Sequence, residues 1–167
     1  MIAEFQRGLA RTTRFSGREA PAAFWPYAFV VLVLALLAIG ACLALLARLE
    51  SGPDFAGLAL WLGIAAVLVV ALLAAAVTRR LHDLDETGLW GLMPLPFLAI
   101  DVVGFPRALS YFAQQIADPW LFAGLFANNI VYLVTLGALL AMLSRDGVPG
   151  PNRHGPVPGL WDFNPAA

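Results

Sequence analysis

The sequence has little charge for its length and no lysine at all. Only 13% of its 167 residues are charged, all ten basic residues are arginine, and the formal net charge is −1. A chain so close to neutral lacks the basic surface that nucleic-acid binding requires, so we expect no nucleic-acid partner. Hydrophobic residues make up 60% of the chain, whereas a typical soluble protein has about 45–50% apolar residues. This excess predicts an integral membrane protein.

Cysteine and histidine are also scarce, which limits the chemistry available to the chain. The one cysteine, Cys42, lies in an apolar run, so no intrachain disulfide can form. Histidine occurs only at His82 and His154, whereas a transition-metal site usually needs three or more nitrogen, sulfur or carboxylate ligands. We therefore expect no metal and no cofactor, with a site made of His82, His154 and Asp83 as the alternative.

Long runs without charge predict transmembrane helices. A helix needs about 20 apolar residues to cross the roughly 30 Å hydrocarbon layer of a bilayer. The predicted spans are residues 22–47, 55–78, 88–105 and 120–144. The predicted fold is a single-domain, all-α membrane protein: an antiparallel bundle of four transmembrane helices with a short N-terminal arm (1–19) and a Gly/Pro-rich C-terminal tail (145–167).

The third span has the weakest sequence pattern of the four. Pro94 and Pro96 lie inside it, and proline is tolerated in a membrane helix where neighbouring groups satisfy the freed carbonyls. We expect a short, kinked span, with a re-entrant segment as the alternative. Asp101 interrupts the apolar run and is expected near the far membrane boundary. Residues 106–118 are expected to form a loop or a helix on the membrane surface.

Arginine is distributed unevenly between the two predicted sides. Only Arg48 and Arg107 fall on one side, and the other eight fall in the arm, the loop between the second and third spans, or the tail. Since basic residues near span ends mark the cytoplasmic side, both termini are expected there. Ile2, Phe5 and Leu9 have helical spacing in the arm. The arm is expected either to lie on the anionic leaflet as an interfacial helix or to form a loose tail.

Three polar segments are expected to meet at the cytoplasmic face under this topology. The first precedes the first span, the second follows the second span, and the third opens the tail. Their candidate site residues are Arg18, Trp25, Arg79, Arg80, His82, Asp83, Gly88, Trp90, Asn152, Arg153, His154, Gly155 and Pro156.

The order and placement of these segments resemble the family of proteins of unknown function called DUF805. The matching residues are Ser16-Gly17-Arg18 with Phe24-Trp25, Arg79-Arg80-Leu81-His82-Asp83 with Gly88 and Trp90, and Asn152 to Pro156. The resemblance covers nearly the whole chain, and it implies a small bacterial inner-membrane protein but no activity. Pro21, Leu89 and His154 depart from the residues usual in the family. Ala23 stands where members often have an acid, so an ion pair that requires an acid before Phe24-Trp25 is not expected here.

The segment from Arg79 to Asp83 has three interpretations. On a continuing helix, Arg79 shares a face with His82 and Asp83, and Arg80 points elsewhere. The favoured interpretation is structural: the arginines anchor the end of the span and Asp83 neutralises them. The alternatives are binding of a lipid phosphate by arginine and general-base catalysis by His82 with Asp83 orienting its ring.

Polar residues inside the spans add one more candidate site. Asn128 and Asn129 are expected to hydrogen-bond a neighbouring helix, with a pore or substrate path as the alternative. The sequence does not specify an activity, and we assign no catalytic residue. We expect a scaffold or regulatory protein that lies in the lipid bilayer and binds a membrane-protein partner, a second copy of itself or anionic lipid headgroups. The alternatives are an oligomeric channel or transporter and an interfacial lipid-modifying enzyme.

Overall fold

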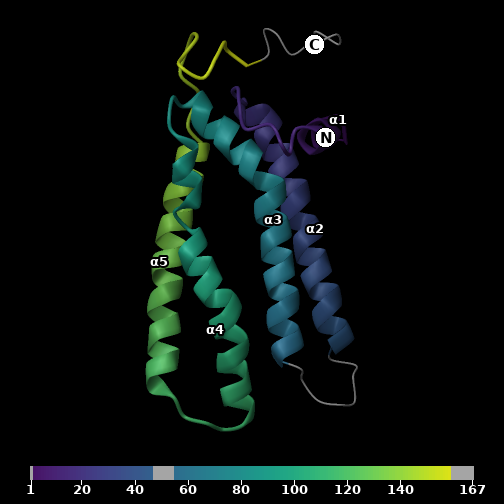
Figure 1. Ribbon diagram of the computed structural model, residues 1–167, viewed down its shortest axis with the longest axis vertical. Coiled ribbons are helices and arrows are strands. Elements are labelled where there is room, and N and C mark those ends of the chain that lie inside the picture. The colour runs from purple at the N-terminus through teal and green to yellow at the C-terminus, as the bar shows by residue number, and fades with distance from the viewer. Residues whose placement is uncertain (1, 47–54, 159–167) are drawn as a thin grey trace.

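The computed structural model describes residues 2–46 and 55–158 (Figure 1). Its helices are α1 (Ile2–Ala10), α2 (Pro21–Leu46), α3 (Phe55–Asp83), the short 3-10 helix η1 (Gly88–Leu92), α4 (Leu95–Ala113) and α5 (Pro119–Leu143). The described residues contain helices and no strand, which confirms the all-α prediction. The predicted turn at 48–54, the last residue of the predicted first span, and the tail beyond residue 158 lie outside the described residues.

Four segments are long and apolar enough to cross a membrane: Pro21–Ala41, Phe55–Asp83, Gly88–Ala113 and Pro119–Leu143. Large apolar side chains are exposed along all four, as Leu36, Val67 and Phe126 illustrate. Such a surface favours aggregation in water, but it is what a helix presents to lipid. The prediction of four membrane-spanning helices is confirmed in length and composition.

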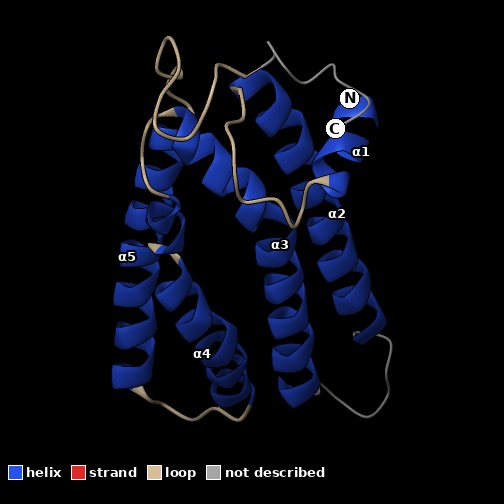
Figure 2. Cartoon of the chain, turned by 45° about the horizontal axis from the view of Figure 1, so that its top comes forward, coloured by secondary structure: helices blue, strands red, loops and turns tan. Residues whose placement is uncertain are grey.

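Successive spans run in opposite directions along the long axis of the molecule (Figure 1). α2 packs against α3, and α4 packs against both α3 and α5. α1 and the described part of the tail lie at the same end of these helices in both views (Figures 1 and 2). We call this end the polar end, because it contains the buried charged residues Arg18, Glu19, Arg79, Arg80 and Asp83.

The prolines of the third span lie at the start of α4 and not in its middle. η1 forms the first part of the span, and Pro94 is the residue that precedes α4. Pro96 lies in the first turn of α4. The missing N–H of proline breaks no helical hydrogen bond at these positions, so the two prolines mark a helix start and leave the span intact.

The third span also extends further than expected. α4 does not end at residue 105 but continues through the buried Pro106 to Ala113, so much of the segment expected to be a loop or surface helix belongs to the span. A proline inside a membrane helix is tolerated where the surroundings satisfy the freed carbonyl. Asp101 lies near the middle of the segment Gly88–Ala113, and its position relative to the membrane boundary stays a prediction.

The apolar core lies next to the polar end and fixes the position of the arm. Its buried members are Phe24, Tyr27, Ala28, Val31, Ala76, Leu81, Leu139 and Leu143. The Tyr27 hydroxyl donates a hydrogen bond to the carbonyl oxygen of Leu72 at 2.9 Å, which joins α2 to α3. Gly8 of α1 lies so close to the Tyr27 ring that a Cβ there would be 2.3 Å from the ring atom Cδ2. The glycine therefore lets α1 lie directly against α2.

Candidate functional site

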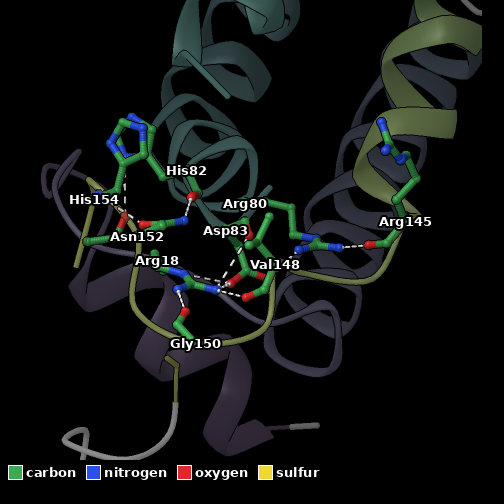
Figure 3. Close-up of polar contacts among 10 residues, drawn as sticks. Arg18, Arg80, His82, Asp83, Arg145, Val148, Gly150, Asn152 and His154 are labelled. Carbon is green, nitrogen blue, oxygen red and sulfur yellow. Dashed lines mark hydrogen bonds and ion pairs between the residues drawn. The ribbon is translucent and has the colours of Figure 1, made fainter. Parts of the chain in front are cut away.

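Asp83, the last residue of α3, is at the centre of the polar end (Figure 3). Its Oδ1 accepts a hydrogen bond from Nε of Arg18 at 2.9 Å, and its Oδ2 accepts one from Nη1 of Arg80 at 2.5 Å. The side chains of Asp83, Arg18 and Arg80 are only 3%, 1% and 0% exposed. One buried carboxylate therefore neutralises part of the charge of two buried guanidinium groups.

Arg18 also holds the tail. Its Nη1 donates to the carbonyl oxygen of Gly150 at 2.6 Å, and its Nη2 donates to that of Val148 at 2.7 Å (Figure 3). The Val148 amide in turn donates to the carbonyl oxygen of Asp83 at 2.9 Å. A Cβ at Gly147 would lie 2.2 Å from Asp83 Oδ2. The tail can pass over Asp83 only because residue 147 has no side chain.

Arg80 joins α3 to the end of α5. Its Nε donates to the carbonyl oxygen of Leu143 at 3.0 Å, and its Nη2 donates to that of Arg145. Carbonyls at a helix C-terminus have no partner inside the helix, and they form the negative end of the helix dipole. The end of α5 therefore supplies further acceptors for the Arg80 guanidinium group, in addition to the Asp83 carboxylate.

A second ion pair joins α3 to the arm. Nε of Arg79 donates to Glu19 Oε2 at 2.7 Å, and Nη2 of Arg79 lies 2.6 Å from the same oxygen without a hydrogen bond of its own. Nη1 of Arg79 donates to the carbonyl oxygens of Arg11, at 2.8 Å, and of Arg14. We call Arg18, Glu19, Arg79, Arg80 and Asp83 the buried network.

Two expectations from the sequence are wrong here. Arg80 was expected to point away from Asp83, yet it contacts Asp83, and Arg79 contacts Glu19 instead. Residues three apart on a helix are neighbours as well as residues four apart, so the position of the arm and tail decides which arginine pairs with which acid. The ion pair thought to be absent because of Ala23 exists, since Glu19 provides an acid before Phe24-Trp25. Glu19 was missed because its partner is distant in the sequence.

An outer layer of tail residues covers His82. The rings of His82 and His154 are stacked, with centroids 3.8 Å apart and planes 6° apart (Figure 3). Asn152 Nδ2 donates to the carbonyl oxygen of His82 at 2.8 Å, and Arg153 Nε donates to His154 Nε2 at 3.1 Å. Arg153 and Asp85 form an exposed ion pair, with side chains 61% and 44% exposed.

The surroundings of His154 lower the pKa of its ring below the ordinary value. Burial is the largest cause, followed by the positive charges that His82 and Arg153 can place beside it, and Asp85 opposes the shift. His82 does not form the expected pair with Asp83. Its Nδ1 donates to the carbonyl oxygen of Gly17 at 3.2 Å, and the Asp83 carboxylate is occupied by arginine. A general base oriented by Asp83 is therefore not assembled.

The remaining candidates of the polar end lie around this network without joining it. Trp25 packs edge-on against Phe24, with ring centroids 5.1 Å apart. Trp90 donates through Nε1 to Glu86 Oε2 at 3.2 Å. Gly88 packs on α3, and the remaining candidates Gly155 and Pro156 lie in the tail, where Gly155 closes a turn with Asn152.

Asp101, Asn128 and Asn129 form a second polar cluster inside the spans. Asn128 Nδ2 donates to Asp101 Oδ1 at 2.8 Å and to the carbonyl oxygen of Phe97 at 3.0 Å. Asn129 Nδ2 lies further away, 3.3 Å from Asp101 Oδ1. These bonds join α5 to α4, as expected for asparagine that links membrane helices. Among all residues that the structure describes, no three His, Cys, Asp or Glu side chains are placed to hold a metal ion.

Four helices long and apolar enough to cross a membrane define a multi-spanning membrane protein. Buried ion pairs join the end of α3 to the segment that precedes α2. Residues 12–156 match the family model described as "Protein of unknown function (DUF805)". This match covers most of the chain and all three polar segments, and the chain belongs to this family. No curated protein and no solved structure matches the chain.

Proposed function

We propose that this protein is a membrane scaffold: it holds a fixed surface at its polar end, on the cytoplasmic side of a bacterial inner membrane, for another membrane protein. The main observation behind the proposal is that the arginines of the buried network bond to acceptors of the chain itself. Arg18, Arg79 and Arg80 are all buried and all donate to acceptors within the chain. Their guanidinium groups are therefore used to hold the chain in place, and a phosphate or a substrate would have to displace those acceptors.

The energetics of buried ion pairs support a positioning role. Such pairs add little net stability compared with apolar side chains of similar size, but removing one partner is strongly destabilising. The network joins segments that are far apart in the sequence: the arm, the end of α3, the end of α5 and the tail. We propose that the network stabilises one arrangement of these segments over others.

The outer surface of the polar end is suited to a protein partner. Arg153 of the tail forms an exposed ion pair with Asp85, and Asp85 lies on the same short segment as the exposed Leu89 and Trp90. Arginine and tryptophan are the residues that most often dominate binding energy at protein interfaces. A surface held rigid by a buried network also loses little conformational freedom when a partner binds.

Two contacts count against the alternative functions. The Asp83 carboxylate bonds arginine and leaves His82 without an orienting acid, which weakens the case for a lipid-modifying enzyme. The amide of Asn128 is used between α4 and α5, which weakens the case for a pore lined by that residue.

In-membrane crosslinking followed by purification of the full-length protein tests the scaffold proposal. We expect one partner protein at a constant ratio to the chain. Trp90→Ala and Arg153→Glu are expected to reduce its recovery about tenfold, the change that corresponds to loss of a principal contact. Arg107→Glu is the matched control, since Arg107 is exposed near the other end of α4. Equal recovery from all variants, or no partner at a constant ratio, would contradict the proposal.

Reporter fusions test the proposed orientation independently. A reporter that is active only in the cytoplasm is expected to be active after residue 84 and after residue 158, and inactive after residue 115. The opposite pattern would place the polar end outside the cytoplasm.

A further inference from the structure

An apolar groove of about 710 Å³ lies between α2 and α3 and is closed at one end by α1. Every side chain that lines it is apolar, including Phe5, Leu34 and Trp61. Ala38 on α2 and Ala65 on α3 are among the lining residues, and their short side chains leave space between the two helices. Sites for small molecules have volumes of about 300–1,000 Å³ and predominantly apolar walls, so the groove has the size and the chemistry of a site for an apolar ligand.

The depth of the groove in the bilayer limits what that ligand is. α3 has 29 residues and is therefore about 43 Å long, which exceeds the roughly 30 Å hydrocarbon layer. The charged end of α3 must then lie among the lipid headgroups. The groove extends along α3 from Leu72 to Leu58, about 21 Å, and so lies within the hydrocarbon layer. An acyl chain is the abundant apolar molecule at this depth.

The arm places positive charge above the end of the groove. Phe5 and Leu9 of α1 line the groove, whereas the side chain of Arg7 is exposed. The carbonyls of Arg11 and Arg14 accept hydrogen bonds from Arg79 at the end of α3, so this part of the arm lies at headgroup level. α1 itself contains one arginine, Arg7, and one acid, Glu4, and Arg11 and Arg14 follow the helix. Basic residues beside an apolar helix face favour binding at an anionic membrane surface.

We infer that the groove binds one acyl chain of an anionic phospholipid and that the arginines of the arm contact its phosphate. Arginine suits this role, because its guanidinium group can donate two parallel hydrogen bonds to a phosphate. The inference concerns the arm and the groove, and it does not depend on the outer surface of the polar end that the scaffold proposal uses.

A second copy of the chain fits the groove less well. In a symmetric dimer the same surface of both subunits meets, so the two arms would lie at the same level beside one another. Each arm carries more basic than acidic residues, with Arg7, Arg11, Arg14 and Arg18 against Glu4 and Glu19, and like net charges brought together destabilise such an interface. A phospholipid headgroup instead brings the opposite charge.

Trp61 in the groove wall provides a reporter for the test. The full-length protein is reconstituted in vesicles of phosphatidylcholine that contain increasing fractions of a lipid with brominated acyl chains, which quench tryptophan on contact. The difference between the wild type and Trp61→Phe isolates the Trp61 signal. We expect half-quenching at a lower fraction of brominated phosphatidylglycerol than of brominated phosphatidylcholine, by about fivefold for each arginine that contacts the phosphate.

Arm and groove variants distinguish this site from ordinary contact with bulk lipid. Arg7→Gln and Arg14→Gln, both at exposed side chains, are expected to reduce the preference for phosphatidylglycerol. Ala65→Leu is expected to fill the groove and lower quenching by both lipids. Ala127→Leu, at an exposed position of α5, is the matched control and is expected to leave quenching unchanged.

Three outcomes would overturn the inference. The first is equal half-quenching by the two brominated lipids in the wild type, and the second is a preference that both arginine variants retain. The third is crosslinking between two copies that Ala65→Leu abolishes, since a second copy would then occupy the groove. The arginine variants decide the question if Ala65→Leu does not fold.

Discussion

Replacing Asp83 by asparagine removes the carboxylate that two buried arginines share. Asp83 is 2% exposed, and its two oxygens accept hydrogen bonds from Arg18 and Arg80. Asn at this position keeps one acceptor oxygen and loses the negative charge. The two guanidinium groups then stay buried with the neutral carbonyls of the tail and of α5 as their principal acceptors.

The expected loss of stability depends on which acceptors remain for the two arginines. Breaking a buried ion pair by removing one partner costs about 3–5 kcal/mol. Asp83 serves two arginines, which favours the upper part of this range, whereas the remaining carbonyl acceptors and the retained amide oxygen favour the lower part. We expect Asp83→Asn to lower the free energy of unfolding by about 3 kcal/mol, a large part of the roughly 5–15 kcal/mol of a typical domain.

Two measurements check this prediction. The first is reversible unfolding in mixed detergent micelles. The second is protease cleavage of the tail, which we expect to accelerate because Arg18 holds Val148 and Gly150. Asp85→Asn is the matched control: Asp85 pairs with Arg153 on the surface, and exposed pairs are worth about 0–1 kcal/mol. A loss for Asp83→Asn no larger than the control loss would refute the reasoning, and so would an unchanged cleavage rate.

Three further predictions use the tail and the spans. Gly147→Ala is expected to displace the tail from Asp83, because the added methyl group has no room, and to lower the free energy of unfolding by about 1–3 kcal/mol in the same titration. The pKa of His154 is lower in the docked tail than in a free one, so the free tail binds the proton more readily. Protection of the tail from protease is therefore expected to be full above about pH 6.5 and to fall as the pH decreases below it. Asn128→Leu removes the bonds to Asp101 and Phe97 and is expected to cost at most about 2 kcal/mol in unfolding.

Each of these three predictions has a matched control variant. Gly137→Ala has open space around the new methyl group and should leave the tail docked; a similar effect at both glycines would remove the steric argument. His154→Phe keeps an aromatic ring without a titratable nitrogen, and persistence of the pH dependence in this variant would assign it to another group. Asn129 is exposed and its bond to Asp101 is longer, so a larger loss for Asn129→Leu than for Asn128→Leu would contradict the proposed contact.

The sequence predicted the polar end better than it predicted the pairing inside it. Spacing along one helix placed Arg79 and Asp83 on a shared face, but Glu19 and Arg80 are their actual partners. The acceptors that complete the network are backbone carbonyls of Leu143, Val148 and Gly150. Every residue type has a backbone carbonyl, so no side-chain motif predicts these contacts. The end of the third predicted helix was wrong for a related reason, since the prediction stopped it before Pro106, whereas α4 continues through this proline to Ala113.

The sequence by itself determined that this chain is a four-span, all-α membrane protein, because apolar runs of that length can be stable only in lipid. It also determined which polar segments border the spans, and these segments carry the resemblance to the family that the chain belongs to. Only the tertiary structure decided how those segments meet. Contacts between residues 60 or more positions apart depend on where α1 and the tail come to lie. The buried network, the stacked histidines and the groove between α2 and α3 all arise from that arrangement and have no signature in local sequence.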